Sequence, residues 1–415
     1  MVLVSHATGN ANVRNVVRGL AASNLLDSYE TTIACFGSGF WHSLSCMPGG
    51  AEIRRRSYDE SLRERTSTYP WREAVRLLSL RLGWSHLVSG EAGYASVYSV
   101  GMDLDRKVAS VLRHKFVNAV YCYEDTALET FREAKRQGLR CLYDLPIGYW
   151  RAGRRLLADE AERRPEWLPT MAGLKDSEEK LARKDAELRL ADRILVASSF
   201  TKMTLQECPF PIAPITVIPY GANDVLSPQD KVVRSSAGSV LRILFVGGLS
   251  QRKGIADLFE AVDTLGAQVE LTVIGRRPAA PCQALDSALR KHRWIESLPR
   301  EQILEQMRAH DVLVFPSLFE GFGLVVTEAL SQGLPVITTP HTCGPDVLTD
   351  GEDGFMVPIR DPQAIAEKLE LLHRDRERLA AMSEAASEKA KMLTWESYRH
   401  GIVTVVREAL SLNSA

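Results

Sequence analysis

Residues 311–339, DVLVFPSLFEGFGLVVTEALSQGLPVITT, decide the fold class of this chain. Two short apolar runs, at 311–317 and 334–339, are typical of buried strands, and a helix is expected to begin near Leu324. Glu320 and two glycines lie in the loop between the first strand and this helix. Strand, loop, helix and strand in this order connect two parallel strands, so the stretch predicts a parallel sheet covered by helices.

The same alternation of apolar runs and amphipathic segments continues along the chain in two halves. Strands are predicted at 2–5, 31–36, 117–123, 140–146, 192–199 and 215–221, and again at 241–249, 269–275, 311–317, 334–339 and 354–359. The predicted fold class is therefore α/β, with two Rossmann-like domains whose parallel sheets face a cleft. The expected parts are an N-terminal domain at 1–222, a polar linker at 223–240, a C-terminal domain at 241–394 and a final amphipathic helix at 395–415.

Composition argues against several classes of function. Of 415 residues, 45% are hydrophobic and 25% are charged, as in ordinary soluble enzymes, and the net charge of −1 gives no sign of nucleic-acid binding. The seven cysteines are dispersed, which indicates reduced thiols rather than a disulfide framework or a zinc site. The N-terminal sequence predicts no signal peptide, and no apolar run reaches the length of a membrane span, so we expect a cytoplasmic protein.

Two segments depart from the alternation. Residues 51–86 and 150–191 are rich in charge, and both are expected to form solvated helices on the surface. The alternative is a surface that docks the acceptor or a membrane, because arginine interleaved with tryptophan and leucine suits an anionic interface. A peripheral contact through 51–86 would place the protein at the inner face of the membrane.

The loop and helix within 311–339 have the chemistry of a ligand site. Ligands of doubly wound sheets bind at the carboxyl edge, where this loop emerges. Gly321 and Gly323 let the backbone approach a ligand, and the first amide groups of the helix can hold a phosphate. Glu328, about one turn into the helix, is suited to accept two hydrogen bonds from a ribose diol. Glu320 would face the group beyond the phosphates.

A second loop supplies positive charge. The stretch VGGLSQRKGI (246–255) also follows a predicted strand and precedes a predicted helix. Arg252 and Lys253 could neutralise a diphosphate leaving group, because charge-assisted hydrogen bonds strengthen as negative charge develops. A basic pair on the surface is the alternative.

Together the two loops resemble the retaining glycosyltransferases of family four, the group 1 glycosyltransferases, which have the GT-B fold. The family's two glutamates separated by seven residues are matched by EGFGLVVTE (320–328), and its Gly-x-Leu-x-x-x-Lys-Gly turn by GGLSQRKG (247–254). Weaker similarities lie at 191–200, 217–223 and 343–358. The resemblance covers residues 190–360 well, and it implies that the final helix crosses back onto the N-terminal domain.

The resemblance also implies roles for individual residues. Arg252 and Lys253 would hold the diphosphate of the donor, Glu320 would contact the transferred sugar, and Glu328 would bind the ribose. Further donor contacts are expected from Gly9, Asn10, Gly248, Gly321, Phe322, Gly323, Leu324 and Val325. No metal and no cofactor are expected, because the cationic pair takes the place of a metal and the nucleotide-diphosphate sugar is a co-substrate.

Two positions depart from the family pattern. Gly248 stands where the family often has an arginine, so Arg252 would supply that charge. Tyr143 stands where the family often has a histidine near the transferred sugar, which leaves Asp144 as the nearest ionisable group. Asp144 is therefore a candidate catalytic residue, and a buried cap of a helix or turn is the equal alternative.

The protein is predicted to be a retaining glycosyltransferase of the hexosyltransferase type that needs no metal and acts in glycan, polysaccharide or glycolipid synthesis. It would move a sugar from a nucleotide-diphosphate donor to a hydroxyl of a glycan, a lipid-linked glycan or a small molecule. Two alternatives stay open, a sugar-nucleotide epimerase or hydrolase of the same architecture and a non-catalytic scaffold. Asp103 and Asp105 form a weaker Asp-x-Asp candidate for a metal site, and His6 suits a structural role as well as a substrate contact.

Overall fold

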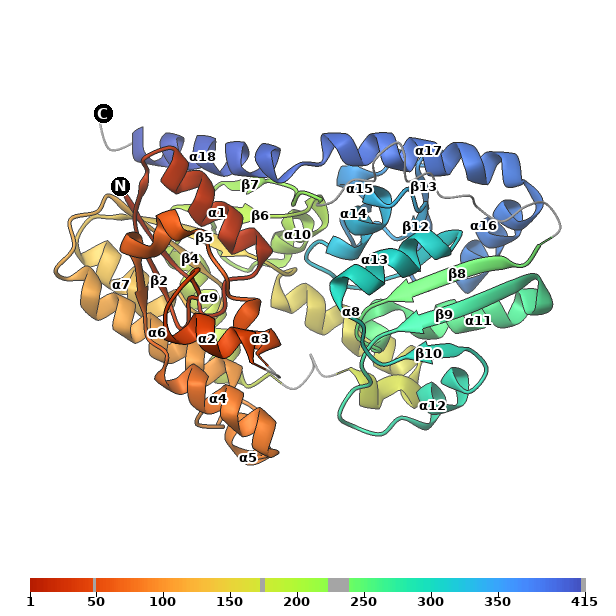
Figure 1. The fold of residues 1–415 in the computed structure, drawn as a ribbon, viewed down its shortest axis with the longest axis horizontal. Coiled ribbons are helices and arrows are strands. Elements are labelled where there is room, and N and C mark those ends of the chain that lie inside the picture. Colours follow the sequence, from red (N-terminus) through yellow and green to blue (C-terminus); the bar gives the residue numbers. More distant parts are fainter. Residues whose placement is uncertain (48–49, 172–175, 223–238, 412–415) are drawn as a thin grey trace.

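The computed structural model describes residues 1–47, 50–171, 176–222 and 239–411, and it contains two parallel sheets (Figure 1). The seven-stranded sheet has the order β3 (Thr66–Thr68), β2 (Leu26–Thr31), β1 (Val2–Ser5), β4 (Ala119–Tyr123), β5 (Arg140–Leu145), β6 (Arg193–Val196) and β7 (Ile215–Val217). The six-stranded sheet has the order β10 (Arg293–Ile295), β9 (Val269–Ile274), β8 (Leu241–Val246), β11 (Val312–Phe315), β12 (Val336–Thr338) and β13 (Gly354–Met356). The predicted α/β class with two parallel sheets is confirmed.

Helices cover both faces of the first sheet, and this is why its central strands β1 and β4 are almost wholly apolar. Every residue of β1 and β4 is buried. Val2 and Val4 pack with α1 (Ala11–Ala22) in one hydrophobic cluster, whereas Leu3 packs in another with α6 (Val97–Leu112) and α7 (Leu128–Arg136). Successive side chains of a strand point to opposite faces, so a strand between two helical layers is apolar at every position.

The strand predicted at 31–36 is wrong, because the strand in this region is β2, which ends at Thr31. The sequence of β2 is LDSYET, in which four residues are polar or acidic and two are apolar or aromatic. Glu30 is fully buried and accepts a hydrogen bond of 3.0 Å from the hydroxyl of Tyr69. The local sequence does not show that this carboxylate has a buried partner, so the pattern of β2 is not that of an apolar strand.

The chain ends in α16 (Pro362–Arg374), α17 (Arg376–Met392) and α18 (Trp395–Ser411), and α18 lies across the first domain (Figure 1). Arg399 of α18 donates a hydrogen bond of 2.9 Å to Asn15 Oδ1 of α1. Gly221 packs against the same crossing, where a Cβ atom would lie 2.3 Å from the backbone nitrogen of Trp395. The predicted return of the final helix is confirmed. Residues 223–238 of the predicted linker lie outside the described residues.

The expectation that 150–191 forms solvated surface helices is wrong. The first part of this segment packs against the C-terminal domain, where Trp167 stacks on Phe259 with ring centroids 6.0 Å apart. Arg163 Nη2 lies 2.6 Å from Asp257 Oδ1 in the same contact. The elements involved are α8 (Trp150–Arg163), the 3-10 helix η2 (Pro165–Thr170) and, on the C-terminal domain, α11 (Ile255–Leu265).

Some charges of this segment, among them Arg163 and Arg164, therefore pair across the domains instead of facing water. No helix in the described ranges combines the length and the hydropathy that a bilayer-spanning segment requires.

Candidate active site

The loop between β11 and α14 (Leu324–Ser331) contacts both domains. Helix α14 begins at Leu324, as predicted, and Gly323 before it has φ +90°, a conformation that favours glycine. A Cβ atom on Gly321 would lie 1.9 Å from the carbonyl oxygen of Pro146 in the N-terminal domain. The hydroxyl groups of Ser198 and Thr201 donate hydrogen bonds of 2.5 and 2.9 Å to the Gly321 carbonyl. Glycine at 321 is thus needed for the two domains to meet at this loop.

The turn at 247–254 brings its cations to this loop. Gly254 has φ +67°, and a Cβ atom there would lie 2.0 Å from the carbonyl oxygen of Pro316. This close approach sets Lys253 Nζ in an ion pair with Glu320. Arg252 Nη1 lies 3.2 Å from Glu320 Oε1 and donates a hydrogen bond of 2.6 Å to the Phe319 carbonyl. Two motifs that are more than sixty residues apart therefore meet, and the structure brings the predicted site residues Arg252, Lys253 and Glu320 together.

Burial makes this cationic pair suited to a strongly negative ligand. Burial lowers the pKa of Lys253 well below its usual range, and the nearby Arg252 lowers it further. Burial also lowers the pKa of Arg252. A diphosphate beside them would stabilise both charged forms, because an opposite charge within a few ångströms favours ionisation. A ligand with more negative charge than Glu320 alone would therefore favour the charged forms of both side chains.

Glu328 lies on the second turn of α14 and is partly exposed. Arg300 Nε, at the start of α13 (Arg300–Ala309), lies 3.3 Å from Glu328 Oε1. The remaining predicted donor residues of this loop would contribute backbone groups. Phe322 is buried and packs on Tyr220 with ring centroids 5.0 Å apart, while Leu324 and Val325 form the first turn of α14, whose amide groups have no intrahelical acceptor.

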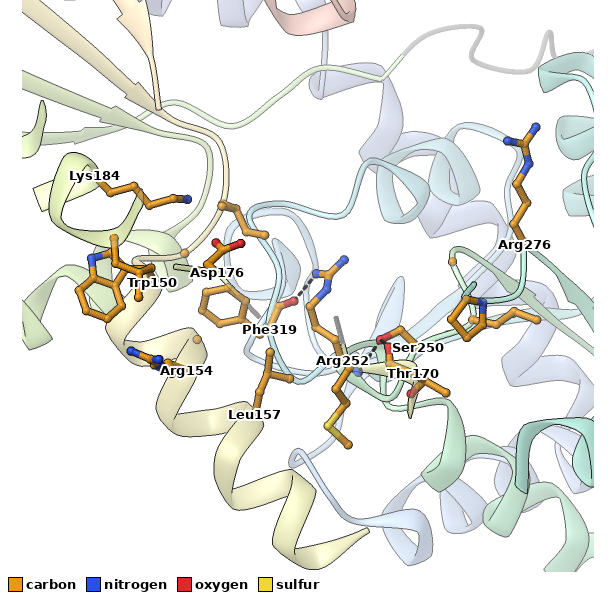
Figure 2. A pocket seen from close by; sticks show the side chains of 18 of the residues that line it. Trp150, Arg154, Leu157, Thr170, Asp176, Lys184, Ser250, Arg252, Arg276 and Phe319 are labelled. Carbon is orange, nitrogen blue, oxygen red and sulfur yellow. Dashed lines mark hydrogen bonds between the residues drawn. The ribbon is translucent and has the colours of Figure 1, made fainter. Parts of the chain in front are cut away.

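A pocket of about 410 Å³ lies between the domains beside these residues (Figure 2). Gly248 and Arg252 line it. Lys253, Glu320 and Glu328 are not among its lining residues, although Glu320 pairs with both Arg252 and Lys253. Sequence reasoning missed the residues that complete its walls, which are Trp150, Arg154, Thr170, Lys184, Ser250 and Arg276. Arg276 follows β9 at the carboxyl edge, a position that could have marked it, and Ser250 lies within the turn at 246–255. The other four come from the segment 150–191, which was expected to be solvated.

The segment 160–170 holds the cationic turn in place. Ser250 Oγ donates a hydrogen bond of 2.7 Å to the Thr170 carbonyl, and the backbone nitrogen of Gln251 donates one of 3.0 Å to Thr170 Oγ1. Gln251 Nε2 also donates a hydrogen bond of 2.7 Å to Glu160 Oε1. An element from the N-terminal half of the sequence is thus part of the support of Arg252 and Lys253.

Replacing Glu160 by glutamine is expected to lower the free energy of unfolding by about 2–4 kcal/mol. Glu160 is fully buried, and its carboxylate lies 3.0 Å from Arg163 and 2.7 Å from Arg360. A glutamine would remove the charge partner of Arg360 and would leave Arg163 paired with Asp257 alone. Urea unfolding measures the difference, and Glu162→Gln, on the exposed face of the same helix, is the matched control. A loss no larger than that of the control would contradict this role.

The N-terminal turn lies in a different place from the pocket. Gly9 has φ +61°, and a Cβ atom there would lie 1.5 Å from the hydroxyl oxygen of Tyr58. The Asn10 side chain caps α1 by accepting a hydrogen bond of 3.3 Å from the backbone nitrogen of Val13. Gly9 and Asn10 line a separate hollow of the first domain, so the structure does not bring these two predicted donor residues to Glu320.

Asp144 is buried at the end of β5 and lines none of the hollows described here. Its Oδ2 accepts a hydrogen bond of 2.7 Å from the hydroxyl of Tyr121. Burial raises the pKa of Asp144 to about 7, while that hydrogen bond opposes the shift. Its surroundings match the buried structural alternative more closely than a contact with substrate.

Asp144→Asn is expected to flatten the pH dependence of stability. A carboxyl group whose folded pKa is raised binds more protons in the folded state, so its contribution to stability is lost as the pH rises from about 4 to about 7. Between pH 5 and pH 8 the variant should lose less stability than the wild type, by on the order of 1–3 kcal/mol. Glu187, whose pKa burial raises to about 8, is present in both proteins, so the difference between their unfolding curves isolates Asp144. Equal slopes would contradict the prediction.

The Asp-x-Asp sequence does not form a metal site. Asp105 accepts hydrogen bonds of 2.8 and 2.9 Å from the backbone nitrogens of Glu129 and Thr130, which caps α7. Asp103 pairs with Lys107 at 2.7 Å. Among the described residues, no group of three or more histidine, cysteine, aspartate and glutamate side chains is arranged to hold a metal ion.

Sequence comparison agrees with this geometry. The profile of the family described as glycosyl transferases group 1 matches residues 229–389. The D-inositol 3-phosphate glycosyltransferase of Corynebacterium urealyticum is 31% identical over 185 residues, which are 39% of this chain and 42% of that protein. The enzyme of the same name from Corynebacterium glutamicum is 28% identical over 57% of this chain and 62% of that protein. The chain thus spans about two fifths to three fifths of the length of these relatives.

Structural comparison covers nearly the whole chain. Sucrose-phosphate synthase from Thermosynechococcus elongatus superposes with a TM-score of 0.67 at 15% identity, over 99% of each chain. The Anabaena protein HepE, solved in complex with UDP, gives a TM-score of 0.62 at 14% identity, over 98% of this chain and 99% of that chain. The chain has the GT-B fold, and its residues 229–389 match the model of the group 1 glycosyltransferases.

Proposed function

We propose that this protein is a retaining glycosyltransferase that moves a sugar from a nucleotide-diphosphate sugar to an acceptor hydroxyl. The observation that carries the proposal is the meeting of Arg252, Lys253 and Glu320 at the carboxyl edge of the second sheet, beside a pocket between the domains. The family match over 229–389 supports the donor class, and so does the fact that HepE was solved with UDP.

In this proposal the main contribution of the protein is that its cations stabilise the leaving group. Arg252 and Lys253 hold the diphosphate and stabilise the negative charge that develops as the bond between the anomeric carbon and the phosphate oxygen breaks. The acceptor oxygen attacks the same face of the anomeric carbon, and its proton passes to the departing phosphate oxygen. The products are the glycoside and the nucleoside diphosphate. The transition state resembles an oxocarbenium ion, so no side chain needs to attack and neither a metal nor a further cofactor is required.

The acceptor would enter from the N-terminal domain. A hollow of about 710 Å³ lies at the carboxyl ends of β1 and β4, and His6, Glu124 and Lys180 are among its lining residues. Burial lowers the pKa of His6 to about 4, and His6 Nδ1 accepts hydrogen bonds from the backbone nitrogens of Thr8 and Gly9 at 3.0 and 2.9 Å. His6 is therefore neutral at physiological pH with its proton on Nε2. We propose a cytoplasmic enzyme with this hollow as the acceptor side.

The proposal is tested by offering UDP-, GDP-, ADP- and dTDP-sugars and following the products by NMR. We expect slow release of one nucleotide, with the free sugar formed first in the α configuration if an α-linked donor is used. An isomerised sugar nucleotide would identify an epimerase instead. If no sugar nucleotide raises the melting temperature or is turned over, the non-catalytic scaffold becomes the better account.

A further inference from the structure

Exposed apolar side chains are concentrated in one part of the first domain. Among the described residues, nine of the sixteen large apolar side chains that are exposed lie between positions 40 and 97. Trp71 is 79% exposed and Phe40 is 70% exposed. They belong to α2 (Phe40–Cys46) and α4 (Trp71–Leu82), and α4 extends away from the first sheet together with α5 (Ser85–Val88) (Figure 1). Such a concentration marks an interaction surface rather than the scatter expected of a protein surface.

The surface is hollowed into an apolar groove. A groove of about 800 Å³ lies between α2 and α4, within the size range of small-molecule sites. Trp41, Leu44 and Leu77 are in its walls together with Phe40 and Trp71, and Glu52 and Arg81 are its charged lining residues. A concave apolar channel suits a hydrocarbon chain, which gains free energy from each methylene group that leaves water.

A cationic hollow adjoins the groove. Glu52 lines both, and the smaller hollow, of about 380 Å³, is otherwise lined by four arginines, Arg14, Arg55, Arg56 and Arg76, and by residues of the Thr8–Ala11 turn. Arg56 and Arg76 share the carboxylate of Glu73, and Arg55 pairs with Glu52 at 2.9 Å. Arg14 donates instead to the carbonyl oxygens of Gly9 and Arg55, at 2.8 and 2.6 Å. Four arginines beside two glutamates leave an excess of positive charge that favours an anion.

Shared lining residues connect the groove to the proposed reaction site. Thr8 lines both the cationic hollow and the larger hollow at the ends of β1 and β4. Asp176 lines both that larger hollow and the pocket between the domains. Four hollows therefore adjoin one another in order. They are the apolar groove, the cationic hollow, the polar hollow at the ends of β1 and β4, and the pocket between the domains.

We propose that the acceptor is a lipid-linked saccharide whose lipid and sugar are joined through a phosphate or diphosphate. Its hydrocarbon chain occupies the groove, its anionic group lies against Arg14 and Arg55, and its sugar reaches the polar hollow. This inference rests on the proposed function and gives it a substrate class. A second copy of this chain would leave the arginines without anionic partners, and a flat bilayer surface would not fill a concave groove.

Dodecyl phosphate, below its critical micelle concentration, is the probe, and isothermal titration calorimetry with the full chain is the measurement. We expect wild-type protein to bind dodecyl phosphate at least ~10-fold more tightly than inorganic phosphate, because only the former has a chain to bury. Leu78→Glu, at an exposed position of the groove, should weaken dodecyl phosphate binding by ~10-fold or more. Arg55→Gln should weaken dodecyl phosphate binding but leave the weaker binding of dodecyl maltoside unchanged. Phe116→Glu, at a fully exposed apolar position outside the groove, is the matched control.

Three results would overturn the inference. Inorganic phosphate could bind as tightly as dodecyl phosphate, which would mean that the groove holds no chain. Sedimentation could show a dimer that Leu78→Glu dissociates, which would assign the groove to a second copy. Vesicles of anionic phospholipid could bind through the groove while monomeric dodecyl phosphate does not, which would assign it to a bilayer surface. Binding of nucleotides to the wild type, titrated in parallel, tests the proposed function separately.

Discussion

Lys253→Ala is expected to lower kcat/KM for sugar transfer by ~10²–10³-fold, mostly through kcat. The ammonium group is buried beside Glu320 and Arg252 and would stabilise the leaving diphosphate most strongly in the transition state. Loss of an interaction that forms mainly in the transition state lowers kcat and kcat/KM together. The rate of nucleotide release at saturating and at low donor concentration separates the two parameters.

Two controls make this result specific. Lys291→Ala removes an exposed lysine that pairs with Asp263 on the same domain, and it should leave both parameters within about 2-fold of the wild type. Arg252→Ala should also lower kcat/KM, because its guanidinium lines the pocket and contacts Glu320. If Lys253→Ala kept activity within the range of the Lys291 control, the diphosphate would have to bind elsewhere.

Glu328→Gln is expected to raise KM for the donor by ~10–100-fold with a much smaller effect on kcat. Hydrogen bonds from a ribose diol to a carboxylate contribute about 1.5–3 kcal/mol, and they form equally in the ground state and the transition state. The Glu328 side chain is 27% exposed and is held by Arg300 at 3.3 Å, so a ribose can reach it without a change in fold.

Equilibrium titration of the nucleoside diphosphate checks the same point without turnover. Glu301→Gln, at an exposed position on α13 beside Arg300, is the control and should bind as the wild type does. Loss of kcat with an unchanged KM would contradict a ribose contact and would move Glu328 into the chemistry instead.

The local parts of the site could be predicted from the sequence because each is short and self-contained. The start of α14 at Leu324 and the glycines before it are fixed by a loop that only glycine can form. The pairing of Lys253 with Glu320 follows once both loops are placed at the carboxyl edge of one sheet.

Other parts depend on partners far away in the sequence. The docking of 150–170 onto the C-terminal domain rests on contacts such as Arg163 with Asp257, and neither partner reveals the other in sequence. Strand β2 was misplaced because the buried Glu30 looks polar until Tyr69 is beside it. These parts of the fold could not be predicted because they depend on polar partners that lie far apart in the sequence.

A crystal structure of the chain with the nucleoside diphosphate selected by the donor panel tests the central claim most directly. The account predicts the diphosphate within hydrogen-bonding distance of Arg252 and Lys253, with the ribose hydroxyls on Glu328 and the open end of the diphosphate directed toward Glu320. Binding in which the diphosphate contacts neither Arg252 nor Lys253 would contradict the donor site, and with it the proposed function.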